Sequence, residues 1–317
     1  MEISLPNFWK VGISPKHNLK EALQWALFFM LGIFFLCACE KPDESAFRQD
    51  LKVAAYGFES YQGTREFQTD ASYEIPYAEI QEISIFSSDA ETGAQVKISG
   101  AFFGPYSFGT QDTIIVFFSG GFGNLDYYYS RIQLLKSISP HYKVLTFDYQ
   151  GIGKSAGEFS FSNIQNDGEA ILSWIKSRAQ NSTVCFYAAG LGSIALMPHN
   201  VMTDSMFFEA PKVILENPFA HSELMVSNAV QFNWSASYTS VTEIDLLSIA
   251  SDQKGNFLML VSELDERLNP EDHGQALFSA INQPKQLVEV SEAGHHSIPV
   301  LLGYSDFIEK LHNFLKQ

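Results

Sequence analysis

Residues 113–124 read TIIVFFSGGFGN, and this stretch decides the fold class. Its first six residues, Thr113 to Phe118, form a continuous apolar run without the alternation of a strand that keeps one face in water. Ser119, Gly120 and Gly121 then supply a tight turn. A buried run that ends in such a turn is typical of a parallel strand covered on both faces and followed by a helix.

The same signature recurs along the rest of the chain. Further buried strands are predicted at Tyr142–Phe147, Thr183–Tyr187, Val213–Leu215, Phe257–Val261 and Gln286–Val290. Helical patterns lie between them, as at 166–178 and 306–315. This alternation predicts an α/β fold with a mostly parallel sheet, helices on both faces, and a ligand crevice at the carboxyl ends of the strands.

Two segments depart from this alternation. Glu82–Phe86 and Val96–Phe103 are short, β-rich and separated by the turn-forming SSDAETG, so they predict an antiparallel opening hairpin. Residues 217–256 are too long for an ordinary loop between a helix and a strand. We expect this insertion to fold as a small cap.

Composition and charge exclude several classes of protein. The chain has 317 residues, 46% of them hydrophobic and 18% charged, which is typical of a globular protein with a sizeable core. Its net charge of −16 would repel a phosphate backbone, so no nucleic-acid partner is expected. Three scattered cysteines favour neither a disulfide scaffold nor a structural zinc site, and no metal or other cofactor is expected.

The amino terminus has the features of a targeting segment. Lysines precede the apolar run Trp25–Cys39, which has the length of a signal-peptide core. The run ends in Leu36-Cys37-Ala38-Cys39, which resembles the bacterial lipobox. This resemblance implies a signal peptide over 1–38, lipidation of Cys39, and export to a membrane facing the periplasm or the cell exterior. An uncleaved helical anchor is the alternative.

The remainder divides into two parts by its pattern. Residues 39–77 are expected to form a tether and an N-terminal extension, because no buried-strand pattern occurs in them. Residues 78–317 carry the alternating pattern and the insertion at about 217–256. We therefore predict that the chain from about residue 78 folds without residues 1–72.

Six motifs stand at the predicted strand ends. In order they are SGGFGN (119–124), DYQGIGKSAGE (148–158), YAAGLGS (187–193), ENPF (216–219), SELDERLNP (262–270) and EAGHHSIP (292–299). In this order and spacing the chain resembles the α/β-hydrolase family, and within it the serine aminopeptidase-like esterases and peptidases with a small cap. The resemblance covers roughly residues 78–316.

The resemblance implies a set of site residues. Asp265 matches the family's acid and His295 its base, while the backbone N–H groups of Gly121 and Leu191 match the oxyanion hole. Two alternatives stay open at this stage. His296 is a second candidate for the base, and Glu263 is a substitute acid. Asp265 would also suit a purely structural role as the cap of the following turn.

The nucleophile of the family is absent from this chain. Its Gly-x-Ser-x-Gly elbow falls on Ala188-Ala189-Gly190-Leu191-Gly192, so Gly190 stands where the serine is expected. Ser193 is the alternative nucleophile, although it lies one helical turn further on. Cys185 is expected to be a buried core residue rather than a catalyst.

The ligand expected from the sequence is a small acyl or peptide-like molecule. Aromatic residues follow the glycine turn and populate the insertion, and they suit either such a ligand or the protein core: Phe122, Tyr127, Tyr128, Tyr129, Phe219, Phe232, Trp234 and Tyr238. Two functional hypotheses follow. In the first, the protein has lost serine catalysis and binds a ligand or partner. In the second, it is an esterase or peptidase that uses Ser193 or a water activated by His295.

Overall fold

The computed structural model describes residues 52–200, 211–225 and 243–317. In these residues an eight-stranded sheet has the order β1-β2-β4-β3-β5-β6-β7-β8. Its strands are β1 (Ile80–Ser88), β2 (Gln95–Phe103), β3 (Thr113–Phe118), β4 (Tyr142–Phe147), β5 (Thr183–Ala189), β6 (Lys212–Glu216), β7 (Asn256–Ser262) and β8 (Lys285–Val290). Strand β2 is antiparallel to β1 and to β4, and every other pair is parallel. The predicted opening hairpin and the mostly parallel sheet are confirmed.

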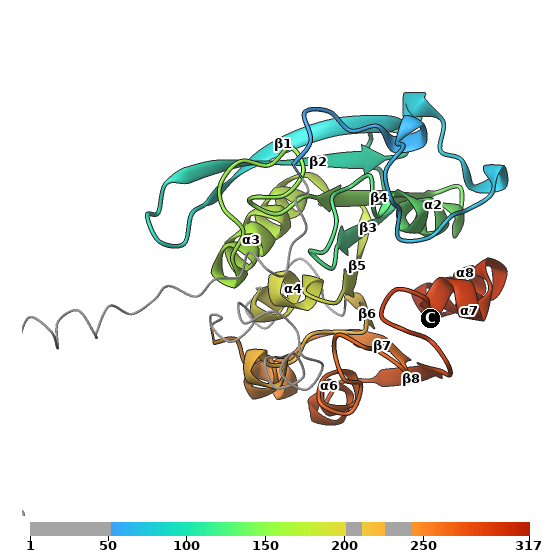
Figure 1. Ribbon diagram of the computed structural model, residues 1–317. Helices are drawn as coiled ribbons and strands as arrows, with labels where there is room; N and C mark the ends of the chain where they lie inside the picture. The colour runs from blue at the N-terminus through green and yellow to red at the C-terminus, as the bar shows by residue number, and fades with distance from the viewer. Residues whose placement is uncertain (1–51, 201–210, 226–242) are drawn as a thin grey trace, which may run out of the picture. The chain divides into compact units, whose positions relative to one another are not determined.

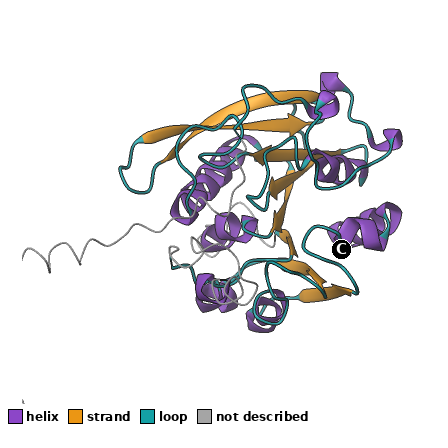
Figure 2. Ribbon diagram, viewed as in Figure 1, coloured by secondary structure: helices purple, strands orange, loops and turns teal. Residues whose placement is uncertain are grey.

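Helices cover both faces of this sheet. They are α2 (Tyr129–Ser137), α3 (Phe161–Arg178), α4 (Gly192–Asn200), α6 (Gly274–Ala280), α7 (Ile298–Leu302) and α8 (Tyr304–Lys316), with 3-10 turns η2 (Phe58–Ser60), η3 (Ala71–Tyr73), η4 (Tyr77–Glu79) and η6 (Leu247–Asp252). Helices α3, α4 and α6 lie on one side, and α2 and α8 on the other (Figures 1 and 2). Among the helices of the described residues, none is long and apolar enough to cross a membrane.

The two covered faces of the sheet explain the continuous apolar run Thr113–Phe118. Strand β3 lies between β4 and β5. Along β3, Ile114 and Val116 pack into the core beneath α3 and α4, while Ile115 and Phe117 pack into the core beneath α2 and α8. A central strand therefore needs an apolar residue at every position.

Helix α3 is longer than its apolar pattern. The pattern predicts a helix over 166–178, but the helix begins at Phe161. Ser160 adopts an extended conformation just before it and accepts a hydrogen bond on its side chain from the N–H of Asn163 at 3.1 Å. This cap satisfies one of the free donors of the first turn, so the helix begins earlier than its periodicity indicates.

The N-terminal extension, described from residue 52 to residue 77, packs against the sheet domain. Phe58 is 4% exposed and Ile75 is 2% exposed, and both lie in the core beneath α2 and α8. Oδ1 of the buried Asp126 accepts hydrogen bonds from the backbone N–H groups of Gly57 and Phe58. The compact unit that contains the sheet runs from Pro42 to Gln317. The extension is therefore an integral part of the domain, and this packing does not favour independent folding of the chain from residue 78.

Only the two ends of the predicted cap are described. Phe219 and Ala220 at the first end, and Ile244 and Leu246 at the second, are buried in the core beneath α3 and α4. Residues 226–242, which include Phe232, Trp234 and Tyr238, lie outside the described residues.

Candidate active site

Gly190 sits in a tight turn between β5 and α4. Its φ of +48° is in the left-handed region, which glycine adopts without steric cost. Its N–H donates to the carbonyl oxygen of Glu216 at 2.9 Å, and its own carbonyl oxygen accepts from the N–H of Phe219 at 3.1 Å. These bonds hold the turn against β6, at the carboxyl end of a central strand.

His295 and Asp265 form a buried pair opposite this turn. Nδ1 of His295 lies 2.7 Å from Oδ2 of Asp265, and the two residues are 5% and 7% exposed. Burial alone would raise the pKa of Asp265, but the interaction with His295 and two backbone hydrogen bonds outweigh it and hold that pKa below its usual value. Because the carboxylate can only accept, Nδ1 carries a proton, and in the tautomer that this fixes Nε2 presents a lone pair.

That lone pair faces the elbow. A Cβ atom built on Gly190 would lie 3.2 Å from Nε2 of His295 and 3.6 Å from Cα of Gly120. The glycine turn after β3, the base and the elbow therefore meet at one point. A side chain on residue 190 would contact the imidazole directly.

The expected oxyanion donors also lie beside the elbow. A Cβ atom on Gly121 would lie 3.3 Å from Cδ1 of Leu191, so the two residues are neighbours. Within the described part of the chain, neither the N–H of Gly121 nor that of Leu191 donates a hydrogen bond. The two residues expected to form the oxyanion hole are therefore neighbours, and each keeps an N–H group without a partner among the described residues.

The alternative residues lie elsewhere. Ser193 is fully buried, and its hydroxyl is 2.8 Å from the carbonyl oxygen of Gly190 and 3.0 Å from that of Phe219. This geometry favours a structural bond beneath the elbow over attack on a ligand. Glu263 accepts a hydrogen bond from the N–H of Glu292, and no contact with His295 is found for it among the described residues.

Asp265 also caps the turn that follows it. Its Oδ1 accepts from the N–H groups of Arg267 and Leu268, each at 2.8 Å, while Oδ2 accepts from His295. The structural role and the pairing role that the sequence left open are therefore filled by different oxygen atoms of one carboxylate.

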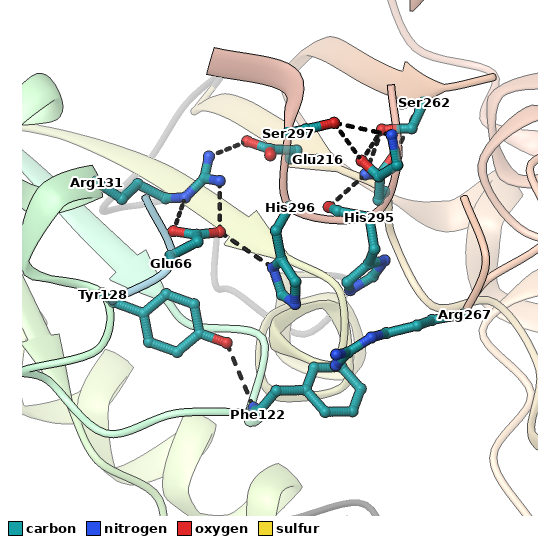
Figure 3. Close-up of polar contacts among 12 residues, drawn as sticks. Glu66, Phe122, Tyr128, Arg131, Glu216, Ser262, Arg267, His295, His296 and Ser297 are labelled. Carbon is teal, nitrogen blue, oxygen red and sulfur yellow. Dashed lines mark hydrogen bonds and ion pairs between the residues drawn. The ribbon is translucent and has the colours of Figure 1, made fainter. Parts of the chain in front are cut away.

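Phe122 covers the histidines. Its ring is perpendicular to that of His295, with centroids 5.6 Å apart, and the guanidinium of Arg267 lies 4.4 Å from its centroid (Figure 3). Tyr128 and Tyr129 are instead fully buried in the core. Among the described members of this aromatic set, Phe122 is therefore the one whose ring contacts His295.

A cavity of about 280 Å³ borders the two histidines. It is lined by Glu66, Glu266, Gly294, His295, His296, Ser297 and Val300. Its lining has two carboxylates and one aliphatic side chain, and none of the described aromatic residues that the sequence offered for a ligand pocket is among them. No set of side chains able to hold a metal ion is assembled among the described residues.

A buried ionic network connects this cavity to the elbow. The guanidinium of Arg131, on α2, donates to both carboxylate oxygens of Glu66 at 2.9 and 2.6 Å and also pairs with Glu216. Burial would raise the pKa of Glu66, but Arg131 and His296 lower it to about 2. Glu66 and Arg131 could not be predicted from the sequence, because each is a lone charge without a motif, and Glu216 stands in the ENPF motif without an expected role.

Cys185 is buried on β5, and burial raises the pKa of its thiol to about 12, as suits a core residue. Cys39 lies outside the described residues, so its predicted lipidation stays a prediction.

Known proteins similar to this chain are α/β hydrolases. No protein-family model matches. The lysophosphatidylserine lipase ABHD12 of Danio rerio is 27% identical over 171 residues, which is 50% of this chain and 44% of that protein. Alpha/beta hydrolase domain-containing protein 17B of Xenopus laevis is 22% identical over 178 residues, which is 55% of this chain and 56% of that protein. The chain thus spans about half the length of these curated relatives.

Solved structures agree with the fold. The esterase Pf2001 of Pyrococcus furiosus superimposes with a TM-score of 0.60 at 16% identity, covering 81% of this chain and 98% of the esterase. Carboxyl esterase 2 of Tuber melanosporum gives a TM-score of 0.54 at 17% identity, covering 80% and 90%. The protein therefore has the α/β-hydrolase fold and is an α/β-hydrolase-like protein, with glycine at the elbow position.

Proposed function

We propose that this protein is an exported α/β-hydrolase-like lipoprotein that binds a small acyl or peptide-like ligand and has lost acyl-enzyme catalysis. One observation carries the proposal: Nε2 of His295 faces Gly190, which has no side chain to activate. Two free backbone donors, at Gly121 and Leu191, stand ready for a carbonyl oxygen of the ligand.

Hydrolysis by water activated at His295 is the second candidate function. The pair with Asp265 supports it, because this pair fixes the tautomer in which Nε2 accepts a proton. A water at the elbow would take the place of the missing hydroxyl. Without a covalent intermediate the rate is expected to be modest.

Restoring the nucleophile tests both candidates. Gly190→Ser places a hydroxyl beside His295, at a cost of about 1–3 kcal/mol for a side chain in a left-handed conformation. We expect this variant to react with a serine-directed fluorophosphonate and to hydrolyse p-nitrophenyl butanoate faster than the wild type. Adding His295→Ala should abolish the gain. Gly190→Ala is the matched control, because it carries the same strain without the hydroxyl.

The outcomes separate the candidates. Wild-type hydrolysis that is lost in His295→Ala, without fluorophosphonate labelling, would favour activated water. A folded Gly190→Ser variant that stays inert would show that the elbow, base and donors are out of register. Ser193→Ala should leave every rate unchanged, and a loss of activity in this variant would contradict our assignment.

The membrane location is proposed on the sequence alone. The match to the lipobox supports lipidation of Cys39, and several acyl chains on one cysteine hold a protein firmly to a bilayer. Expression in a Gram-negative host with an alkyne-tagged palmitate should label the wild type and Cys37→Ala, but not Cys39→Ala. Unchanged labelling of Cys39→Ala would contradict the proposal.

A further inference from the structure

His296 forms a second pair with a carboxylate, next to the first. Its Nδ1 lies 3.2 Å from Oε1 of Glu66, in the N-terminal extension. Glu66 is ionised, because Arg131 holds both of its oxygens. A carboxylate accepts only, so Nδ1 of His296 carries the proton and its Nε2 presents a lone pair. Burial also lowers the pKa of His296, which keeps the ring neutral.

The lone pair of His296 has no partner among the described residues. Its Nε2 is buried and accepts no hydrogen bond. The rings of Phe122, Tyr127 and His295 surround the imidazole, with centroids 6.2, 5.9 and 4.6 Å away. None of these rings offers a polar donor to Nε2 in this arrangement. A buried acceptor without a partner is costly and rare, so it calls for an explanation.

The two pairs repeat one arrangement. In each, Nδ1 donates to a buried carboxylate: His295 to Asp265, and His296 to Glu66. Nε2 of His295 faces Gly190, and His296 lines the adjoining cavity. The rings stand nearly perpendicular, at 81°, and both lie on the same side of Phe122 (Figure 3). The first pair faces the elbow, and the second lies next to the first.

We propose that the Glu66–His296 pair is a ligand-recognition element, in which Nε2 of His296 accepts a hydrogen bond from a hydroxyl or protonated amine of the ligand. This inference rests on the proposed function, because it assumes that the acyl carbonyl of the ligand binds at the elbow. The ligand class is then an ester or amide with a hydrogen-bond donor a short distance from its carbonyl. The N-terminal extension, through Glu66, becomes part of the binding site.

The charge of the adjoining cavity supports a donor-bearing ligand. Glu66 and Glu266 line it together with the hydroxyl of Ser297, so acceptors outnumber donors. Such a lining binds a neutral alcohol or an ammonium group and disfavours an anion. Val300 adds an apolar wall for the carbon chain.

Two substitutions of His296 distinguish the roles of its two nitrogen atoms. In His296→Asn the amide stands near the place of Nδ1, so the hydrogen bond to Glu66 is kept and the outer acceptor is lost. In His296→Gln the longer side chain carries its oxygen toward the place of Nε2, so an acceptor is restored. The Asn variant keeps a partner for the buried Glu66, which favours correct folding.

Four esters with the same acyl group serve as probes. Propyl butanoate has no donor, 2-hydroxyethyl butanoate has a neutral donor, 2-(dimethylamino)ethyl butanoate has a protonated amine with one N–H, and butyrylcholine has a positive charge without a donor. Dissociation constants are measured on the wild type by ligand-observed NMR, which also reports any hydrolysis. We expect the two donor esters to bind about three- to tenfold more tightly than propyl butanoate.

The variants decide the inference. His296→Asn should bind all four esters about equally, and His296→Gln should regain at least part of the preference. A preference that survives in His296→Asn would overturn the role of His296, and tighter binding of butyrylcholine than of both donor esters would show that charge rather than donation selects the ligand. If no ester binds, the proposed function fails and this inference with it. If all bind alike to the wild type, this inference alone fails.

Discussion

Asp148 is a fully buried carboxyl group just beyond β4. The hydroxyl of Tyr56, in the N-terminal extension, donates to its Oδ2 at 2.6 Å. Burial raises the pKa of Asp148 to about 7, in spite of the hydrogen bonds that lower it. The unfolded chain would titrate this group near its usual value of about 4.

This difference predicts a loss of stability as the pH rises. Between about pH 4 and pH 7 the native state holds a proton that the unfolded state has released, so the free energy of unfolding falls as the pH rises through 7. Asp167, with a pKa raised by burial to about 6, acts in the same direction. Asp148→Asn should reduce the fall by roughly 3 kcal/mol in urea unfolding at pH 4 to 8.

Asp306→Asn, at an exposed position on α8, is the control and should follow the wild-type pH profile. An Asp148→Asn profile parallel to that of the wild type would show that the native state does not raise the pKa of Asp148.

At the scale of single residues, the sequence predicted the positions that a motif marks. Gly190, Asp265 and His295 stand in motifs at strand ends, and the resemblance of these motifs to the α/β-hydrolase family predicted that they lie together. Glu66 and Arg131 could not be found in this way, because they are 65 positions apart and belong to no periodic pattern. Only the folded chain shows that their charges meet.

Gly168 marks the closest approach of two helices. It lies on α3, and a Cβ atom there would be 1.9 Å from the carbonyl oxygen of Ala195 on α4. The backbone of Ala195 cannot move away as a flexible side chain can. The substitution Gly168→Ala must therefore push the two helices apart. The elbow, which leads into α4, would shift with that helix.

We expect Gly168→Ala to lower the free energy of unfolding by about 2–4 kcal/mol, although alanine alone favours a helix over glycine by about 1 kcal/mol. Urea unfolding measures the change. Glu169→Ala, at the next and exposed position, should change the value by less than about 0.5 kcal/mol. Equal stability of Gly168→Ala and wild type would contradict this close packing.

At the scale of elements, strands were easier to predict than helix ends. Buried parallel strands such as β3 are apolar at each position, and that run has clear limits in the sequence. The start of α3 depends on one hydrogen bond, which the side chain of Ser160 accepts from the N–H of Asn163, and not on periodicity. The cap could be predicted only as an insertion. Its length indicates that it folds, but gives no information about its structure.

The domain as a whole includes the N-terminal extension. Without it, Arg131 would keep its pair with Glu216 but lose the carboxylate of Glu66, and breaking a buried ion pair costs up to about 3–5 kcal/mol. The apolar contacts of Phe58 and Ile75 would be lost as well. This sum approaches the whole stability of a typical domain.

We therefore expect the chain 42–317 to unfold cooperatively in urea and the chain 78–317 to be insoluble or to unfold at a clearly lower urea concentration. Equal midpoints for the two chains would instead support a domain boundary near residue 78. The sequence did not reveal the role of the extension, because its contacts are single residues spread over a polar stretch.

The network around Arg131 also affects the order in which parts of the chain fold. Glu66 is separated by 65 positions from Arg131 and by 230 from His296, and Arg131 by 85 from Glu216. Contacts between such distant residues close late, because each must first overcome the entropy of a long loop. We expect the extension to take its final place late in folding, because its contact with His296 must wait for the last strand and its histidine loop. The first part of the domain to be synthesised is thus among the last to be fixed.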